Sequence, residues 1–316
     1  KIGQNNLFDI PQHITFIQKF REKYFFGSGF ELQQISAIIL NHIFAADKDE
    51  RALDTAKTNL WKEAVKLNPR IYNYRKLNGD KFHILPNLEL NFICGDSLCD
   101  MDTDKQIRII ASEFKADIVK LHQIRNEYIN DPYHPEIIEQ ALEIRKKIRT
   151  RLAQETEHFG QSLFYCSEYF YCFFDENGEP LSESERGFSG VISNPPWEAI
   201  KPVKKEFAKQ SKSEMDILHF KKWFDDKLKS DEAFCQRWQD YTKFYEDYTA
   251  FLYGKYEYQS TGDPNYYKFF MERDFQIIGQ NGFYCLLVPS GFQTDEGSNK
   301  LRELLINSYC LIELSS

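Results

Sequence analysis

The feature that most limits how this chain can fold is a short apolar run that ends in two consecutive prolines. Residues 191–193 read as a strand, and Asn194, Pro195, Pro196 and Trp197 follow at once. Proline fixes φ and donates no backbone hydrogen bond, so the strand stops there and the loop is rigid. In such a loop the Asn194 side-chain carbonyl and the Pro195 carbonyl can converge on a planar amino group. Trp197 can then stack on the ring that carries it.

An amino group held in this way loses its resonance with the ring, and its lone pair becomes available to attack a methyl group. The alternative interpretation of the same residues is a plain proline turn after a buried strand.

A second apolar run, residues 41–46, ends in Asp47 and Lys48 and precedes an alanine-rich helical pattern. An acid at the tip of the second strand of a nucleotide-binding fold is placed to take both ribose hydroxyls of a cofactor. Asp47 is therefore a candidate cofactor ligand, although it can also be a solvated helix cap. Asp49 is the residue that we expect to cap the helix.

A third predicted strand, residues 88–94, closes with Gly95, Asp96 and Ser97. Taken alone, Gly-Asp-Ser is an ordinary turn sequence.

Further strands and helices alternate along the chain. We expect an aromatic strand at 163–174, a helix from 265 to a glycine turn at Gly279–Gly282, and a strand at 283–288. A helix at 301–305 and a strand at 309–314 follow. Five or six strands alternating with helices predict an α/β fold with a parallel, doubly wound, Rossmann-like sheet.

Residues 103–160 interrupt this alternation with charged helical patterns on either side of a turn at 131–135. They predict an inserted antiparallel helical hairpin. The expected organisation is 1–102 as the N-terminal, cofactor side of one domain, 103–160 as the insertion and 161–316 as the catalytic part. The insertion carries a basic run that is either a solvated face or a contact to nucleic-acid phosphate: Arg145, Lys146, Lys147, Arg149 and Arg151.

The Asn194–Trp197 tetrapeptide resembles the catalytic loop of DNA methyltransferases that modify the exocyclic amino group of adenine. With residues 187–196, which read Gly-Phe-x-x-Val-Ile-x-Asn-Pro-Pro, the chain looks like the large methylases of type IIG restriction–modification and phage-exclusion systems. The resemblance covers roughly residues 41–100 and 160–316. It implies S-adenosyl-L-methionine as cofactor, Asp47, Lys48, Asp96 and Ser97 as its contacts, and Asn194, Pro195, Pro196 and Trp197 as the catalytic residues.

The family's glycine loop is the weakest match. Gly27-Ser28-Gly29 lies in a region that reads as helical, so it is either that loop or a helix-ending turn. On the second interpretation the true loop lies upstream of Lys1. Because the chain begins with Lys1 rather than Met, we expect a trimmed piece of a longer protein.

Composition limits the partners. The net charge is −8, whereas a domain that grips DNA alone is normally basic. A target-recognition domain or subunit outside this chain is therefore expected. The seven cysteines lack a Cys-x-x-Cys pair, which suits a reducing cytoplasm and argues against a zinc site, so no metal is expected. No apolar run is long enough to span a bilayer. Lysines after Trp197 either contact phosphate or form an exposed face: Lys201, Lys204, Lys205, Lys209 and Lys212.

The resemblance implies double-stranded DNA with a flipped adenine as substrate. Three alternatives remain open. They are a protein-glutamine methyltransferase, a DNA-binding or scaffold module that has lost the cofactor, and a restriction nuclease.

Overall fold

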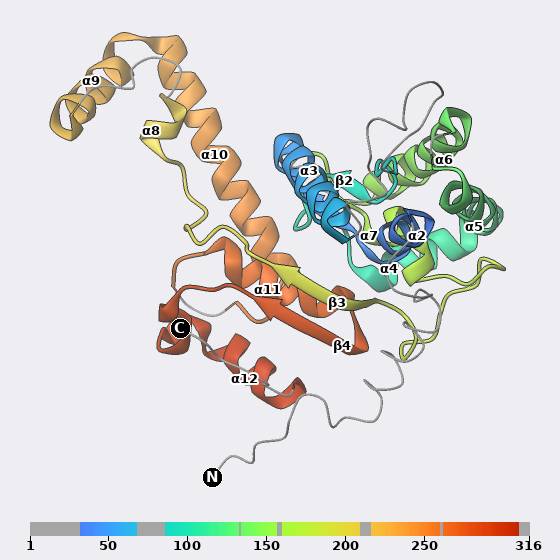
Figure 1. The fold of residues 1–316 in the computed structure, drawn as a ribbon. Coiled ribbons are helices and arrows are strands. Elements are labelled where there is room, and N and C mark those ends of the chain that lie inside the picture. The colour runs from blue at the N-terminus through green and yellow to red at the C-terminus, as the bar shows by residue number, and fades with distance from the viewer. Residues whose placement is uncertain are drawn as a thin grey trace. The chain divides into compact units, whose positions relative to one another are not determined.

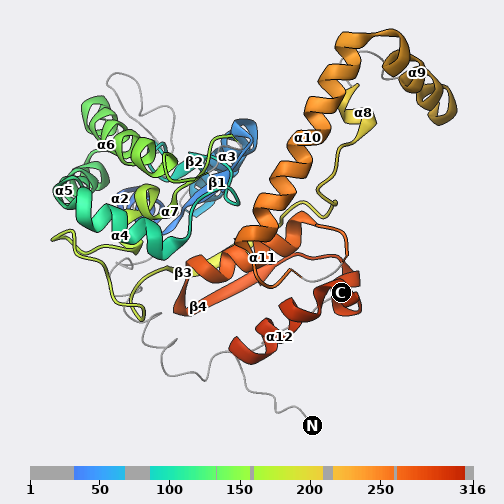
Figure 2. The ribbon, with the colours of Figure 1, turned by 180° about the vertical axis from the view of Figure 1, so that it is seen from behind.

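The computed structural model describes residues 32–67, 86–132, 134–156, 160–208, 216–259 and 262–309. The chain divides into two compact units. The first is built mainly from residues up to Phe188, and the second mainly from Ser189 onward. Figures 1 and 2 show their elements from opposite sides.

The first unit contains a parallel pair of three-residue strands, β1 (Ala45–Asp47) and β2 (Phe92–Cys94), with Asp47 opposite Cys94. Helix α2 (Leu32–His42) precedes β1, and α3 (Glu50–Leu67) follows it. The strand–acid–helix prediction around Asp47 is confirmed, but both strands are shorter than predicted. Residues 41–42 end α2, and the Leu88 carbonyl accepts the amides of Asn91 and Phe92 in a turn.

Three helices, rather than the predicted two, occupy the charged segment: α4 (Thr103–Glu113), α5 (Lys115–Asn130) and α6 (Pro135–Ala153). The first predicted helix is interrupted at Phe114, which leaves helical geometry with φ −130° and ψ 20°. Proline suits the first turn of α6 because that position needs no amide donor. These helices bury an isoleucine and leucine stripe and belong to the same unit as β1 and β2.

The interpretation of the basic run on α6 as a solvated or phosphate-binding face holds for the exposed Lys146 and Lys147 but is wrong for Arg145. The Arg145 side chain is buried, donates to the Leu90 carbonyl at 3.1 Å and lies 3.6 Å from Glu168. Arg149 lies 3.3 Å from the same buried carboxylate. Ion pairs also join Lys147 to Asp117 and Arg151 to Glu113 and Glu155. Apart from Lys146, which is exposed, the run ties helices together.

The predicted aromatic strand at 163–174 is also wrong. It forms one helical turn, α7 (Tyr165–Glu168), and a 3₁₀ turn, η2 (Phe170–Cys172). Tyr169 and Phe170 are buried, and the Tyr169 hydroxyl donates to the Ala45 carbonyl at 2.9 Å, which ties this segment to β1.

The second sheet pairs β3 (Phe188–Ser193) with β4 (Ile278–Leu286). The predicted helix before β4 is α11 (Tyr266–Ile277), but it leads directly into the strand without the predicted glycine turn. After β4 come two 3₁₀ turns, η3 (Ser290–Gln293) and η4 (Glu296–Ser298), and the predicted helix, α12 (Asn299–Ser308). Tyr267, Met271, Phe292 and Leu301 form the core of this part.

Between β3 and α11 the chain makes a helical excursion that we call the arm, residues 201–263. It contains α8 (Lys204–Phe207), α9 (Ile217–Ser230) and α10 (Glu232–Lys255). Asp216 and Asp231 cap α9 and α10 with their side chains. The arm has an aromatic core of its own, centred on Phe220, Phe224 and Phe234.

The fold is therefore mixed α/β, as predicted. In the described residues the strands form two two-stranded sheets, so the continuous doubly wound sheet and the three-part domain organisation stay predictions. No described helix combines the length and apolarity needed to cross a membrane.

Candidate functional site

The loop after β3 presents its polar and aromatic groups outward. Asn194 and Pro196 are exposed, whereas Pro195 between them is buried. Trp197 is 51% exposed, which is unusual for so large an apolar side chain. An amide and an indole face are thus accessible at the end of one strand, as the predicted chemistry requires.

Hydrogen bonds hold this loop on both sides. The Leu287 amide donates to the Ser193 carbonyl at 3.1 Å, and the Trp197 Nε1–H donates to the Leu287 carbonyl at 3.3 Å. On the other side the Ile200 amide donates to the Pro264 carbonyl at 2.7 Å, and the Tyr266 amide to the Glu198 carbonyl at 3.2 Å. Two fixed φ angles and four hydrogen bonds therefore restrict the orientation of the indole.

Leu287 and Pro264 were missed in the sequence because they act through backbone carbonyls, which leave no mark in side-chain identity. The only available signal was position, since Leu287 lies near the predicted end of β4.

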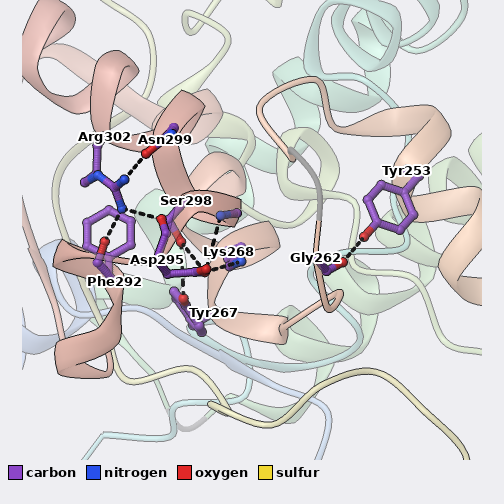
Figure 3. A network of polar contacts seen from close by, with 10 residues as sticks. Tyr253, Gly262, Tyr267, Lys268, Phe292, Asp295, Ser298, Asn299 and Arg302 are labelled. Atoms are coloured by element: carbon purple, nitrogen blue, oxygen red, sulfur yellow. Dashed lines mark hydrogen bonds and ion pairs between the residues drawn. The ribbon is translucent and has the colours of Figure 1, made fainter.

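The segment that follows β4 is tied to α11 by a partly buried network (Figure 3). The Lys268 ammonium is buried and lies 2.9 Å from an Asp295 carboxylate oxygen, which also accepts from Ser298 Oγ at 3.1 Å. Lys268 holds the pKa of Asp295 below its ordinary value. Arg302 donates to the carbonyls of Phe292 and Asp295. The network fixes the segment that begins just after Leu287, the acceptor of the Trp197 indole.

In the first unit Asp47 and Lys48 are exposed at the end of β1. One Asp47 carboxylate oxygen accepts the Asp49 amide at 2.8 Å. The predicted capping role of Asp49 is confirmed, because its carboxylate accepts the Arg51 amide at 3.0 Å in the first turn of α3.

Asp47 is the last residue of β1, and Asp96 lies two residues beyond the end of β2. Since β1 and β2 are parallel, both acids lie at the same edge of the pair. The Asp96 amide donates to the Gln161 carbonyl at 2.7 Å, and its carboxylate accepts the Leu98 amide at 2.9 Å. Gln161 also donates to the Cys94 carbonyl at 3.0 Å and was missed in the sequence. Ser97 is buried, and its Oγ accepts from the Tyr165 hydroxyl at 3.0 Å, so it braces the turn from inside.

Some predicted residues cannot be located. Gly27, Gly29, Lys209 and Lys212 lie outside the described residues. Within the part of the chain that the structure describes, no three His, Cys, Asp or Glu side chains are grouped to hold a metal ion.

The sequence model of the Eco57I restriction-modification methylase family matches residues 41–234 and 237–316. The match includes Asp47, Asp96 and the whole Asn194–Trp197 loop. The chain belongs to the Eco57I restriction-modification methylase family. Comparison with curated proteins finds no match, and neither does comparison with solved structures. Membership in this methylase family agrees with the resemblance inferred from the diproline loop.

Proposed function

We propose that this chain is a DNA methyltransferase domain that transfers a methyl group from S-adenosyl-L-methionine to the N6 amino group of adenine. The observation that carries the proposal is the exposed, hydrogen-bonded Asn194–Trp197 loop in a member of a restriction-modification methylase family. The proposal includes a larger parent protein with a target-recognition domain or subunit elsewhere.

In this proposal the target adenine leaves the duplex, because its amino group cannot be reached while it is paired. The Asn194 side-chain carbonyl and the Pro195 carbonyl accept the two amino hydrogens, and Trp197 stacks on the base. These contacts direct the nitrogen lone pair away from the ring. S-adenosyl-L-methionine, when bound, supplies the electrophilic methyl group. As the new nitrogen–carbon bond forms, the carbon–sulfur bond breaks, and a proton then leaves the nitrogen.

The location of Asp47 and Asp96 at one edge of the β1–β2 pair, and the accessibility of their carboxylates, support their role as cofactor ligands. The Asp47 carboxylate is exposed at a strand tip and has a second oxygen beyond the one that accepts the Asp49 amide, which suits two ribose hydroxyls. Asp96 is half-buried at the same edge and held by Gln161. The proposal keeps Lys48 and Ser97 as the remaining cofactor contacts, next to these two acids in the sequence. Pro196 keeps the catalytic loop rigid because its φ angle is fixed. A doubly wound sheet built from 1–102 and 161–316, with 103–160 inserted, remains part of the proposal.

A methyl-labelling assay tests the function. The full-length protein is given S-adenosyl-L-methionine with a labelled methyl group, together with unmodified DNA or a protein extract. Label in DNA supports the proposal, whereas label in protein favours the glutamine alternative. If no label is transferred and titration calorimetry shows no cofactor binding, the chain is a scaffold module instead.

A further inference from the structure

The charges of this acidic chain are distributed very unevenly. Between Lys201 and Lys229 there are nine lysines and five acidic residues, an excess of four positive charges, within a chain of net charge −8. The rest of the chain therefore carries twelve net negative charges. The basic stretch begins four residues after Trp197, and its described helices are α8 and α9. Acidic residues elsewhere in residues 201–263 balance it, so the arm as a whole has no net charge.

Most of the lysines that the structure describes between Lys201 and Lys229 are exposed. Lys204 pairs with Asp225 at 3.0 Å, and Lys227 pairs with Asp231 at 3.3 Å. The exposed ones are Lys201, Lys205, Lys221, Lys222 and Lys229. Lys204 lowers the pKa of Asp225, and Lys221 and Lys229 act in the same direction, so three lysines surround one carboxylate.

Aromatic packing holds the helices of the arm, which carry these lysines, in place. Phe224 of α9 packs on Phe234 and Trp238 of α10, with ring centroids 5.2 and 5.0 Å apart. At the other end Tyr256, which follows α10, packs on Phe269 of α11. Ala199 and Asn265 pair across the base of the arm. Figure 1 shows α10 running between these two ends.

The length of α10 sets the reach of the arm. Its 24 residues extend about 36 Å. The lysines of α9, which packs on the first turns of α10, therefore lie on the order of 30 Å from the base of the arm, which corresponds to roughly nine base pairs of duplex. Lys204 of α8 lies closer, because only five residues separate it from Ala199 at the base.

We propose that the exposed lysines of α9, namely Lys221, Lys222 and Lys229, bind the phosphate backbone of DNA about one helical turn from the base that the Asn194–Trp197 loop receives. The inference rests on the proposed function and adds to it a specific nucleic-acid contact within this chain. Lysine is suited to this role because phosphate contacts carry affinity without sequence information.

The exposed Ile217 and Leu218 at the start of α9 offer an alternative, a protein partner, which the test below separates from DNA.

The test compares two triple variants of the full-length protein. The arm variant replaces Lys221, Lys222 and Lys229 with glutamine. The control variant replaces Lys62, Lys120 and Lys146, which are exposed lysines of α3, α5 and α6. Both lose three positive charges, so any effect of net charge alone is matched. Affinity for a mixed-sequence duplex of about 40 base pairs, several turns longer than the reach of the arm, is measured by fluorescence anisotropy across a salt series.

If the arm binds phosphate, the slope of log K against log salt becomes shallower by about 2.7 in the arm variant and changes much less in the control. A footprint around the methylated base would lose protection about nine base pairs away in the arm variant only.

If the protein methylates DNA but the two triple variants have equal salt slopes of DNA affinity and equal footprints, the inference is wrong and the proposed function stands. If the wild-type protein neither binds nor methylates DNA, both fail. A loss of methylation in Ile217→Ser/Leu218→Ser but not in the arm variant would assign the surface to a protein partner and overturn the inference.

Discussion

Trp197 shows how a single residue can be both exposed and fixed. Its indole N–H donates to the Leu287 carbonyl, while half of the side chain remains accessible. Replacing Trp197 with alanine should slow methyl transfer by roughly 5- to 150-fold, because stacking on a base contributes about 1–3 kcal/mol. Trp197→Phe keeps a ring but loses the hydrogen bond. It should cost roughly 2- to 12-fold, from about 0.5–1.5 kcal/mol.

Single-turnover methylation with saturating cofactor measures both effects. Trp223→Phe, in the aromatic core of the arm, is the matched control and should leave the rate unchanged. Equal rates for wild type and Trp197→Ala would exclude the stacking role.

Asp47 should control cofactor affinity rather than stability. Asp47→Asn replaces one carboxylate oxygen with a donor, so it should weaken S-adenosyl-L-methionine binding roughly 10-fold or more, as expected for the loss of a hydrogen bond to a charged group. Asp49→Ala, which removes the helix cap, should lower the thermal midpoint and leave affinity nearly unchanged. Calorimetric titration and thermal unfolding of both variants separate the two roles. Equal affinity of wild type and Asp47→Asn would refute the assignment.

Gly190 in β3 is required because the Phe283 ring of β4 covers it. A Cβ at residue 190 would lie 2.3 Å from the ring, far inside contact distance. Because Phe283 is 53% exposed, its ring can turn away at some cost, and Gly190→Ala should destabilise the protein by about 1 kcal/mol. Gly254→Ala in α10 is the control: a Cβ there meets open space, and alanine should stabilise the helix by about 0.5–1 kcal/mol. Chemical denaturation of both variants measures this, and a neutral Gly190→Ala would contradict the packing described.

The catalytic tetrapeptide could be predicted from sequence because its chemistry depends on side-chain identity and on the fixed geometry of proline. The position of Ser97 inside the turn could not, because it depends on Tyr165, 68 residues away. Arg145 was misinterpreted for the same reason, since its carboxylate partner Glu168 lies on another helix.

At the scale of whole elements, sequence periodicity failed where a segment is buried on every side. Leu163, Phe170 and Phe174 are all nearly inaccessible, so residues 163–174 carry no alternation that distinguishes a strand from helical turns. In β4 the glycines were read as a turn. Gly279 instead allows a close backbone approach, because a Cβ there would lie 3.1 Å from the Arg186 carbonyl oxygen.

Helix α11 should make stability depend on pH. Burial raises the pKa of Asp274 from 3.8 to about 7, and Arg273 offsets part of this rise. One Asp274 carboxylate oxygen has no hydrogen-bond partner in the described residues, and neither has the buried Tyr284 hydroxyl. The folded state therefore binds a proton that the unfolded state has released between pH 4 and 7, so stability falls as the pH rises through that window.

Asp274→Asn should remove this dependence and stabilise the protein above pH 7 by as much as about 4 kcal/mol. Urea unfolding at pH 5 and pH 8 measures the effect, with the exposed Asp240→Asn on α10 as control. If wild type and Asp274→Asn respond to pH identically, Asp274 is ionised in the folded protein and the predicted burial effect is absent.

For the molecule as a whole, the family match and the diproline loop point to one chemistry, and the lysines of α9 offer an acidic chain a local contact to DNA. An overall charge of −8 predicts that the main DNA-gripping surface lies outside this chain. The distribution of charge modifies that expectation, since a local basic surface can contact phosphate within a negative protein.

The most direct test of the account is the chemical identity of the methylated product. DNA treated with the full-length protein is digested to nucleosides and analysed by mass spectrometry, in parallel with DNA treated with the Asn194→Ala variant. The account predicts N6-methyladenine with the wild type and a loss of at least about 100-fold with Asn194→Ala, the scale seen when a single transition-state hydrogen-bonding group is removed. Methylated cytosine, or N6-methyladenine formed equally well by the variant, would contradict it.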